Sequence, residues 1–208
     1  RIQGSQATNP DRLLPMLESK PGDAFDPTRA ERDAGRLAAG GDYTRSDYLL
    51  LRGSKPGEGD ALVFDLEDKP WGPHYLNLGL DLGTDLSGRS AFNLKISHNS
   101  RWLTPNGTEW RNRVQIGEVP RLFTELYHPL AWNDSRANDW FVAGYAGAER
   151  RRLTLYRADN GQELAAFRRN TSTLGLDIGQ PWGEFGELRL GWSRVDMGNR
   201  LLLLSSQL

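Results

Sequence analysis

Hydrophobic and polar residues alternate without interruption between positions 76 and 83. Leucine stands at Leu76, Leu78, Leu80 and Leu82, and asparagine, aspartate and two glycines stand between them. Successive side chains of a β-strand point to opposite faces, so this stretch predicts a strand with one apolar face. The pattern alone leaves open whether a protein core or membrane lipid covers that face.

The same alternation recurs over the rest of the chain. It predicts strands near residues 74–84, 90–101, 108–118, 121–130, 139–156, 164–179 and 187–196. Turn-forming residues separate these segments, among them Pro105-Asn106-Gly107 and Asp159-Asn160-Gly161. The connections are too short for crossover helices, so residues 70–208 are expected to form an antiparallel meander.

Helix signals are confined to the region before Pro70. Asn9-Pro10 and Asp26-Pro27 are each typical of a helix start. Lys20-Pro21-Gly22 is expected to end the first helix, and Gly40-Gly41 the second. Strands are expected at 2–6, 43–51 and 61–68, and a hairpin loop at 53–59. The order β-α-α-β-β predicts a small α+β domain over residues 1–69.

Three features of residues 70–208 favour a sheet whose apolar face contacts membrane lipid. A soluble β-sandwich stays an alternative. Several strands reach the ~9–11 residues that cross a tilted bilayer. The polar face mixes charged residues with glycine, as barrel lumens do. Aromatic residues gather near strand ends, which resembles the girdles at membrane interfaces; the candidates are Trp71, Tyr75, Trp102, Trp132, Trp140 and Trp182, with Phe185 beside the last.

Composition excludes several function classes. The 208 residues carry a net charge of −1, so the overall charge does not indicate a nucleic-acid partner. Cysteine is absent, so disulfides, thiolate zinc sites and cysteine nucleophiles are excluded. No stretch approaches the roughly 18 apolar residues of a transmembrane helix. The chain begins at Arg1 as if inside a strand, and we expect the natural N-terminus upstream.

No group of residues predicts a catalytic, cofactor or metal site. His74, His98 and His128 fall in different expected strands without ligand spacing. The charges Glu109, Arg111 and Arg113 are interpreted as lumen residues. Two basic runs, 150–152 and 168–169, flank the hairpin at 159–161; salt bridges to Glu149 and Glu163 are favoured over contacts with lipopolysaccharide phosphates.

Spaced motifs across the chain resemble one region of bacterial patatin-like outer-membrane proteins. They include Gly41-Asp42-Tyr43, Glu67-Asp68-Lys69-Pro70-Trp71-Gly72-Pro73-His74-Tyr75-Leu76, Trp110-Arg111-Asn112 and Gly186-Glu187-Leu188-Arg189-Leu190-Gly191. In that family a patatin-type lipase domain precedes a POTRA domain and a C-terminal barrel of the Omp85 (bacterial surface antigen) superfamily. The resemblance implies POTRA topology for 1–69 and the N-terminal part of the barrel for 70–208.

The resemblance also implies that parts are missing. The lipase serine of that family lies in G-x-S-x-G, and the nearest stretch here, Gly191-Trp192-Ser193-Arg194-Val195, lacks the second glycine. No catalytic residue is therefore carried over, although the parent protein is expected to be a patatin-like lipid acyl hydrolase. Family barrels have sixteen strands, and this chain supplies seven or eight, so we expect a fragment.

The expected function is anchoring in the bacterial outer membrane, with residues 1–69 in the periplasm. Expected partners are outer-membrane lipids, the adjoining patatin domain, and a peptide that adds as a strand to 43–51 or 61–68. A homodimer that pools strands, a self-closing eight-stranded barrel, and a soluble β-rich binding module stay open as alternatives.

Overall fold

The structure is a computed structural model, and it describes residues 1–53, 59–84, 90–130, 140–158, 161–182 and 186–204. The chain divides into two compact units. The first comprises Arg1–Tyr75, Ser100–Glu109 and His128–Trp140; the second comprises Leu76–Asn99, Trp110–Tyr127 and Phe141–Leu208. Among the described residues, no helix is both long and apolar enough to cross a membrane.

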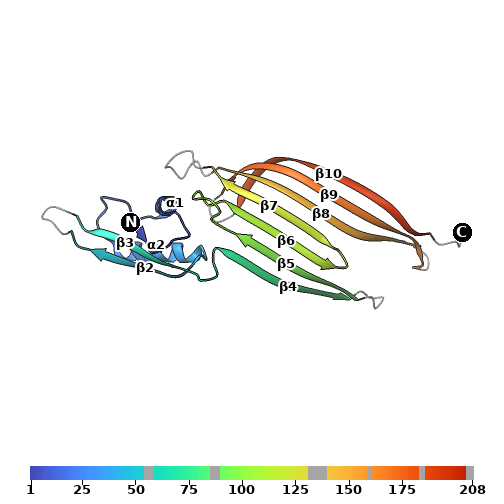
Figure 1. The fold of residues 1–208 in the computed structure, drawn as a ribbon, viewed down its shortest axis with the longest axis horizontal. Coiled ribbons are helices and arrows are strands. Elements are labelled where there is room, and N and C mark those ends of the chain that lie inside the picture. Colours follow the sequence, from blue (N-terminus) through green and yellow to red (C-terminus); the bar gives the residue numbers. More distant parts are fainter. Residues whose placement is uncertain (54–58, 85–89, 131–139, 159–160, 183–185, 205–208) are drawn as a thin grey trace. The chain divides into compact units, whose positions relative to one another are not determined.

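The first unit holds a three-stranded sheet and the helices of the chain (Figure 1). Its elements are β1 (Ile2–Gln3), α1 (Pro10–Leu13), the 3₁₀ turn η1 (Leu14–Met16), α2 (Pro27–Ala39), β2 (Tyr43–Leu51) and β3 (Ala61–Asp68). The sheet order is β1-β3-β2, with β3 parallel to β1 and antiparallel to β2. The expected β-α-α-β-β order is confirmed, and the bounds of β2 and β3 agree with the expected ones.

Helix α2 covers this sheet through a buried stripe. Asp26 caps its N-terminus by accepting hydrogen bonds from the N–H groups of Thr28 and Arg29, which satisfies donors that have no partner inside the helix. The core cluster of the unit consists of Ile2, Leu13, Leu17, Ala34, Leu37, Tyr43, Phe64 and Leu66.

Two boundaries in this unit differ from the expected ones. The strand expected at 2–6 ends at Gln3, because Gly4 adopts φ +93°, where a Cβ would clash with the Leu66 carbonyl oxygen. The first helix changes into the 3₁₀ turn at Leu14, because Pro15 has no N–H to donate to the carbonyl four residues earlier.

The second unit is built on a seven-stranded antiparallel sheet (Figure 1). Its strands are β4 (His74–Thr84), β5 (Ser90–Ser100), β6 (Glu109–Gly117), β7 (Arg121–Pro129), β8 (Phe141–Tyr156), β9 (Glu163–Pro181) and β10 (Glu187–Leu204). They lie side by side in chain order, so the expected meander is confirmed. In the part of the chain that is described, the sheet is not closed, and β4 and β10 are its edges.

The end of β10 is the main correction in this unit. The strand was expected near residues 187–196, and the run Leu201 to Leu204 beyond it breaks the alternation. Instead β10 continues to pair with β9 as far as Leu204. A register shift between Leu201 and Leu203 absorbs the irregular stretch. Trp132, Phe185 and the hairpin residues 54–58 lie outside the described residues.

Candidate functional site

One face of the seven-stranded sheet carries exposed apolar side chains. In β4, Leu76, Leu78, Leu80 and Leu82 are 65%, 70%, 64% and 75% exposed. Later strands continue the face with large side chains that are also exposed: Phe92, Leu94, Trp110, Ile116, Leu122, Leu126, Val142, Leu174, Leu176, Ile178, Leu188, Leu190 and Trp192. We call this the apolar face. Exposed large apolar side chains on all seven strands of one sheet are unusual for a soluble monomer.

Strand register shows that the apolar side chains of β8, β9 and β10 share one face. Leu190 is the Cα partner of Ile178, and Trp192 is the partner of Leu176. Val142 on the other side of β9 is also the partner of Ile178. Partners in a sheet point the same way, so the apolar positions of β8, β9 and β10 form one surface.

A small polar cluster interrupts the apolar face, and its members bond to one another. The Trp110 indole donates to Thr124 Oγ1 (2.9 Å), and Thr124 donates to Asn112 Oδ1 (2.7 Å). Asn112 lies 3.3 Å from His98 Nδ1. Side-chain groups that are hydrogen-bonded in this way are far less costly away from water. Alternation along β6 places Trp110 on this face, whereas its pairing with three polar neighbours depends on register and was not predicted from sequence.

The opposite face of the sheet, called the inner face, buries an ionic network around Glu125. Glu125 is 7% exposed. Its carboxylate lies 3.0 Å from Arg111 Nη1 and 2.8 Å from Arg189 Nη1. Arg189 also lies 3.5 Å from Asp177 and forms an ion pair with Glu187. Removing charges from water is costly unless they are paired and hydrogen-bonded, and here the acids and bases satisfy one another.

Aromatic rings pack beneath the arginines of this network. The Arg111 guanidinium lies 4.8 Å from the centre of the Tyr127 ring, and that of Arg189 lies 5.1 Å from the Phe141 ring. Glycine makes room for them, because a Cβ at Gly179 would lie 2.5 Å from Phe141. The predicted lumen residue Arg111 is therefore part of a packed inner surface.

The two faces together reverse the arrangement of a soluble protein. Soluble sheets bury leucine and expose arginine and glutamate. Here the leucines of β4 are more than 60% exposed while Glu125 is buried. Such a sheet suits an apolar solvent on one side and a polar interior on the other.

The candidate girdle aromatics occupy different surroundings. Trp71, Trp140 and Trp182 are 61%, 38% and 75% exposed. Tyr75 and Trp102 instead bond within the first unit: the Tyr75 hydroxyl donates to Asp42 Oδ1 (3.0 Å) and the Trp102 indole to Asp42 Oδ2 (3.2 Å). A girdle role for these residues stays a prediction.

The basic runs are only partly paired. Arg151 lies 3.3 Å from Glu149, and Arg152 lies 3.1 Å from Glu163, so the favoured salt bridges are confirmed for these two. Arg150 and Arg169 bond to amides instead: Arg150 Nε donates to Asn170 and Arg169 Nε donates to Asn199.

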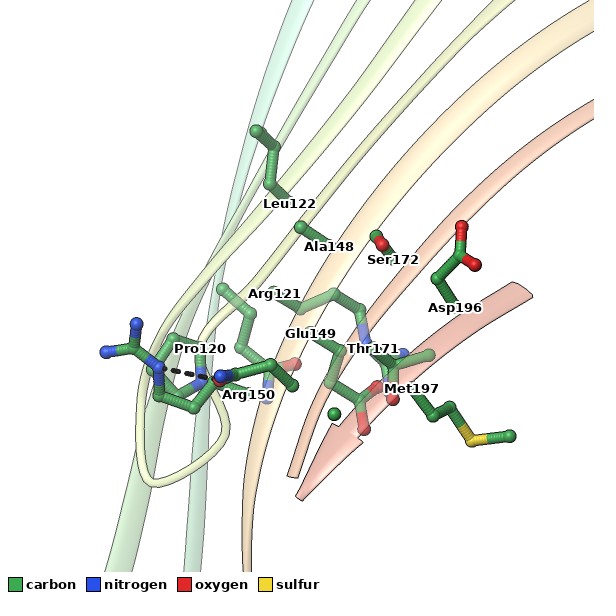
Figure 2. A pocket seen from close by; sticks show the side chains of 13 residues that line it. Pro120, Arg121, Leu122, Ala148, Glu149, Arg150, Thr171, Ser172, Asp196 and Met197 are labelled. Carbon is green, nitrogen blue, oxygen red and sulfur yellow. Dashed lines mark hydrogen bonds and ion pairs between the residues drawn. The ribbon is translucent and has the colours of Figure 1, made fainter. Parts of the chain in front are cut away.

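A shallow groove of about 750 Å³ lies next to these arginines on the second unit. Ala148, Ser172 and Asp196 are Cα partners across β8, β9 and β10, and their side chains follow one another across the groove (Figure 2). Arg150, Asn170 and Gly198 form the next row. The groove offers hydroxyl, amide and charged groups on a flat surface.

None of the described groups predicts metal or nucleophilic chemistry. No cluster of three or more histidine, aspartate or glutamate side chains among the described residues could hold a metal ion. His74, His98 and His128 each contact a neutral side chain on another segment, namely Ser100, Asn112 and Thr108. Ser193 lies inside β10, away from any strand-to-helix turn.

Comparison with known proteins connects the chain to one fold. No family model matches, and no curated protein matches by sequence. Among solved structures the chain is similar to BamA from Haemophilus ducreyi, in a crystal structure lacking POTRA domains 1-3. The match has a TM-score of 0.58 and 10% identity, and covers 95% of this chain and 42% of the BamA chain. The fold of this chain therefore resembles less than half of that BamA chain.

Proposed function

We propose that the seven-stranded sheet is part of an outer-membrane β-barrel that anchors the chain in the membrane. The apolar face contacts lipid, and the inner face with Glu125 and its arginines lines the polar lumen. The observation that carries this proposal is the exposure of Leu76, Leu78, Leu80 and Leu82 opposite a buried ionic network. The likeness to BamA supports the same architecture.

A pair of lysine substitutions tests this proposal. Leu176→Lys places a charge on the apolar face, where it costs about 2–4 kcal/mol at the bilayer midplane. Ser193→Lys, on β10 and directed to the inner face, is the matched control, because it adds the same charge to a polar surface. The urea midpoint of the vesicle-inserted chain should fall for Leu176→Lys alone. Equal effects, or a wild-type chain that stays monodisperse without detergent, favour the soluble binding module.

The first unit is proposed to be a periplasmic POTRA domain. Its β-α-α-β-β order and its sheet order β1-β3-β2 support this assignment. The BamA match also covers 95% of the chain, more than the second unit alone supplies. Added protease should digest the first unit from one side only of a sealed vesicle, while the sheet stays protected.

The two edges of the sheet require partners in a membrane. Unpaired backbone groups at β4 and β10 would each cost several kcal/mol in hydrocarbon. We propose that further strands of a longer polypeptide complete the barrel, as the resemblance to patatin-like outer-membrane proteins implies. The mass of this chain in detergent micelles separates the alternatives: a dimer indicates strand pooling between two copies, and a compact, protease-resistant monomer indicates closure on itself.

An adjoining patatin-type lipase domain stays a proposal from the sequence resemblance alone. This chain should then show no lipid hydrolysis, whereas a longer protein that contains a G-x-S-x-G domain should be active. Replacement of that serine by alanine should abolish the activity. Hydrolysis by the present chain would contradict the assignment of catalysis to another domain.

Strand β2 is the proposed acceptor of a peptide by strand addition. It forms one edge of the three-stranded sheet, and β3 lies between β1 and β2. Leu49, Leu50 and Leu51 on β2 are 49%, 40% and 45% exposed, which gives an incoming strand apolar contacts. Segment 61–68, the other sequence candidate, already pairs with β2 along its length.

Two proline variants test the edge. Backbone N–H groups along β2 point alternately to β3 and to the free edge, so of Leu49→Pro and Leu50→Pro only one breaks the existing ladder. The variant that keeps the wild-type melting temperature should lose peptide binding. Unchanged peptide binding by that variant would contradict strand addition at β2.

A further inference from the structure

Strand register brings three arginines side by side at one level of the sheet. Arg152 on β8 is the Cα partner of Arg168 on β9, and Arg168 is the partner of Arg200 on β10. No register shift separates them from Leu176 and Leu190. All five positions are even-numbered, so the three arginines lie on the same face as the exposed leucines. We call them the arginine row.

The arginine row carries more positive charge than its neighbours balance. Arg152 pairs with Glu163 at 3.1 Å. For Arg168 and Arg200, the described residues provide no carboxylate within ion-pair distance. Arg150, on the same face one row closer to the leucines, donates from its Nε to the Asn170 amide oxygen rather than to a carboxylate. Like charges directly opposite one another destabilise a sheet, so an external anion would stabilise this surface.

With Trp182 taken as the anchor at one membrane interface, strand length places the row at the height of the opposite headgroups. Fourteen residue steps separate Trp182, at one end of β9, from Arg168. They span roughly 45 Å along the strand at about 3.3 Å per residue. For a strand tilted by about 40° this is about 35 Å along the membrane normal. The hydrocarbon core of a membrane is about 30 Å thick, and the membrane with its headgroups is about 40–45 Å thick. A height of about 35 Å exceeds the core, so Arg168 falls in the opposite headgroup layer.

The adjoining groove indicates what kind of headgroup fits. Its lining includes Arg150, Asn170, Ser172 and Asp196 from the even-numbered positions, which offer donors and acceptors over a flat strand surface. Glu149, Thr171 and Met197, from the positions between them, also line it (Figure 2). Such groups suit the hydroxyls of a sugar, while guanidinium groups bind phosphate with two parallel hydrogen bonds. Sugar and phosphate together are the chemistry of a phosphorylated glycolipid.

We propose that the arginine row and the groove beside it bind the phosphorylated sugar headgroup of lipopolysaccharide in the outer leaflet. This inference rests on the proposed membrane orientation of the apolar face. The guanidinium groups supply the counter-charge that divalent cations otherwise provide between phosphates. Binding is therefore expected to persist in EDTA.

The test measures co-purification of lipid A with the chain in dodecyl maltoside micelles containing EDTA. Arg168→Gln/Arg200→Gln should lower lipid A affinity by about tenfold or more, because charge-assisted contacts to phosphate are lost. Arg151→Gln/Arg169→Gln is the matched control. These two are also Cα partners, one position away on the inner face, and removing them removes the same charge.

Three results would overturn the proposal. They are equal loss in both double variants, equal affinity for dephosphorylated lipid A, and competition by inorganic phosphate as strong as by lipid A. The last would indicate a free-anion site. Phenylglyoxal modification of the wild-type chain gives an answer without variants: lipid A should protect Arg168 and Arg200, and leave Arg151 and Arg169 reactive. Protection of neither pair contradicts the proposal.

Failure of this inference is distinguishable from failure of the membrane proposal. Insertion into phosphatidylcholine vesicles without lipid A tests the apolar face alone. A chain that inserts and shows no preference for phosphorylated lipid A retains the proposed function and loses the arginine site. A chain that does not insert contradicts both.

Discussion

Asp33 shows how a single buried residue organises the first unit. Its side chain is fully buried in α2 and accepts hydrogen bonds from the backbone N–H groups of Glu18 (2.7 Å) and Ser19 (2.9 Å). Burial alone would raise the pKa of Asp33, but the two backbone N–H groups, together with the Ser19 side chain and Arg36, outweigh it and hold the pKa below its ordinary value. The carboxylate thus fixes the loop that precedes α2.

Stability of the first unit should therefore fall at low pH. Asp33 has a lower pKa in the folded than in the unfolded chain, so its contribution is complete above the unfolded value of about 3.9. It is lost as the pH falls through the folded pKa. Asp33→Asn should reduce the free energy of unfolding by about 2 kcal/mol at pH 7 and flatten this acid dependence. Urea unfolding between pH 2 and pH 7, followed by tryptophan fluorescence, measures both.

Glu125 should be the most sensitive position of the inner face. Glu125→Ala leaves Arg111 and Arg189 without their shared acid and should cost about 3 kcal/mol. Arg189→Ala in the same background should restore part of the loss, since one uncompensated cation is then removed. Urea unfolding of the chain folded in micelles gives the coupling between the two. Additive effects would show that the network does not act as a unit.

The structural roles of Asp33 and Glu125 could not be predicted from sequence. Asp33 depends on backbone N–H groups 14 and 15 residues away, and Glu125 depends on Arg189, 64 residues away. Only the folded chain brings these groups together. The alternating leucines needed no such information, because period-two alternation within one strand already assigns their side to a face.

At the scale of elements, strands were predicted far better than their ends. The seven strands of the sheet and the bounds of β2 and β3 follow from alternation and turn residues. The prediction failed at Pro15, where a missing N–H shortened a helix, and at Leu201 to Leu204, where pairing with β9 overrides a broken pattern. The local sequence pattern predicts where a strand occurs. The length of the strand also depends on pairing with the neighbouring strand.

The segment after α2 should hold the start of β4 in place. Asp42 is 8% exposed and accepts hydrogen bonds from Arg101 Nη1 (2.8 Å), the Tyr75 hydroxyl and the Trp102 indole. Asp42→Ala leaves these donors without their acceptor, which should raise trypsin cleavage at Lys69 by about tenfold. Asp47→Ala is the control, since Asp47 is exposed and pairs only with Arg45. Unchanged cleavage of Asp42→Ala would show that Asp42 does not hold the start of β4 in place.

At the scale of the whole molecule, the exposed leucines and the buried charges have one explanation in common. When lipid covers leucine, tryptophan and isoleucine on the apolar face, no protein layer is needed there. The polar residues then lie on the inner face and pair with one another. The sequence was compatible with a membrane barrel and with a soluble β-sandwich, because alternation alone does not identify whether lipid or protein covers the apolar face. The structure adds that the described residues place no second layer over the apolar face.

The most direct test of this account is a cysteine scan of β9, which the cysteine-free sequence makes clean. Single cysteines at positions 173–178 are labelled with an environment-sensitive fluorophore in the vesicle-inserted chain, and quenching by brominated lipid is measured. The account predicts strong quenching at 174, 176 and 178 and weak quenching at 173, 175 and 177. Uniform quenching, or none at the even positions, would contradict contact between the apolar face and lipid.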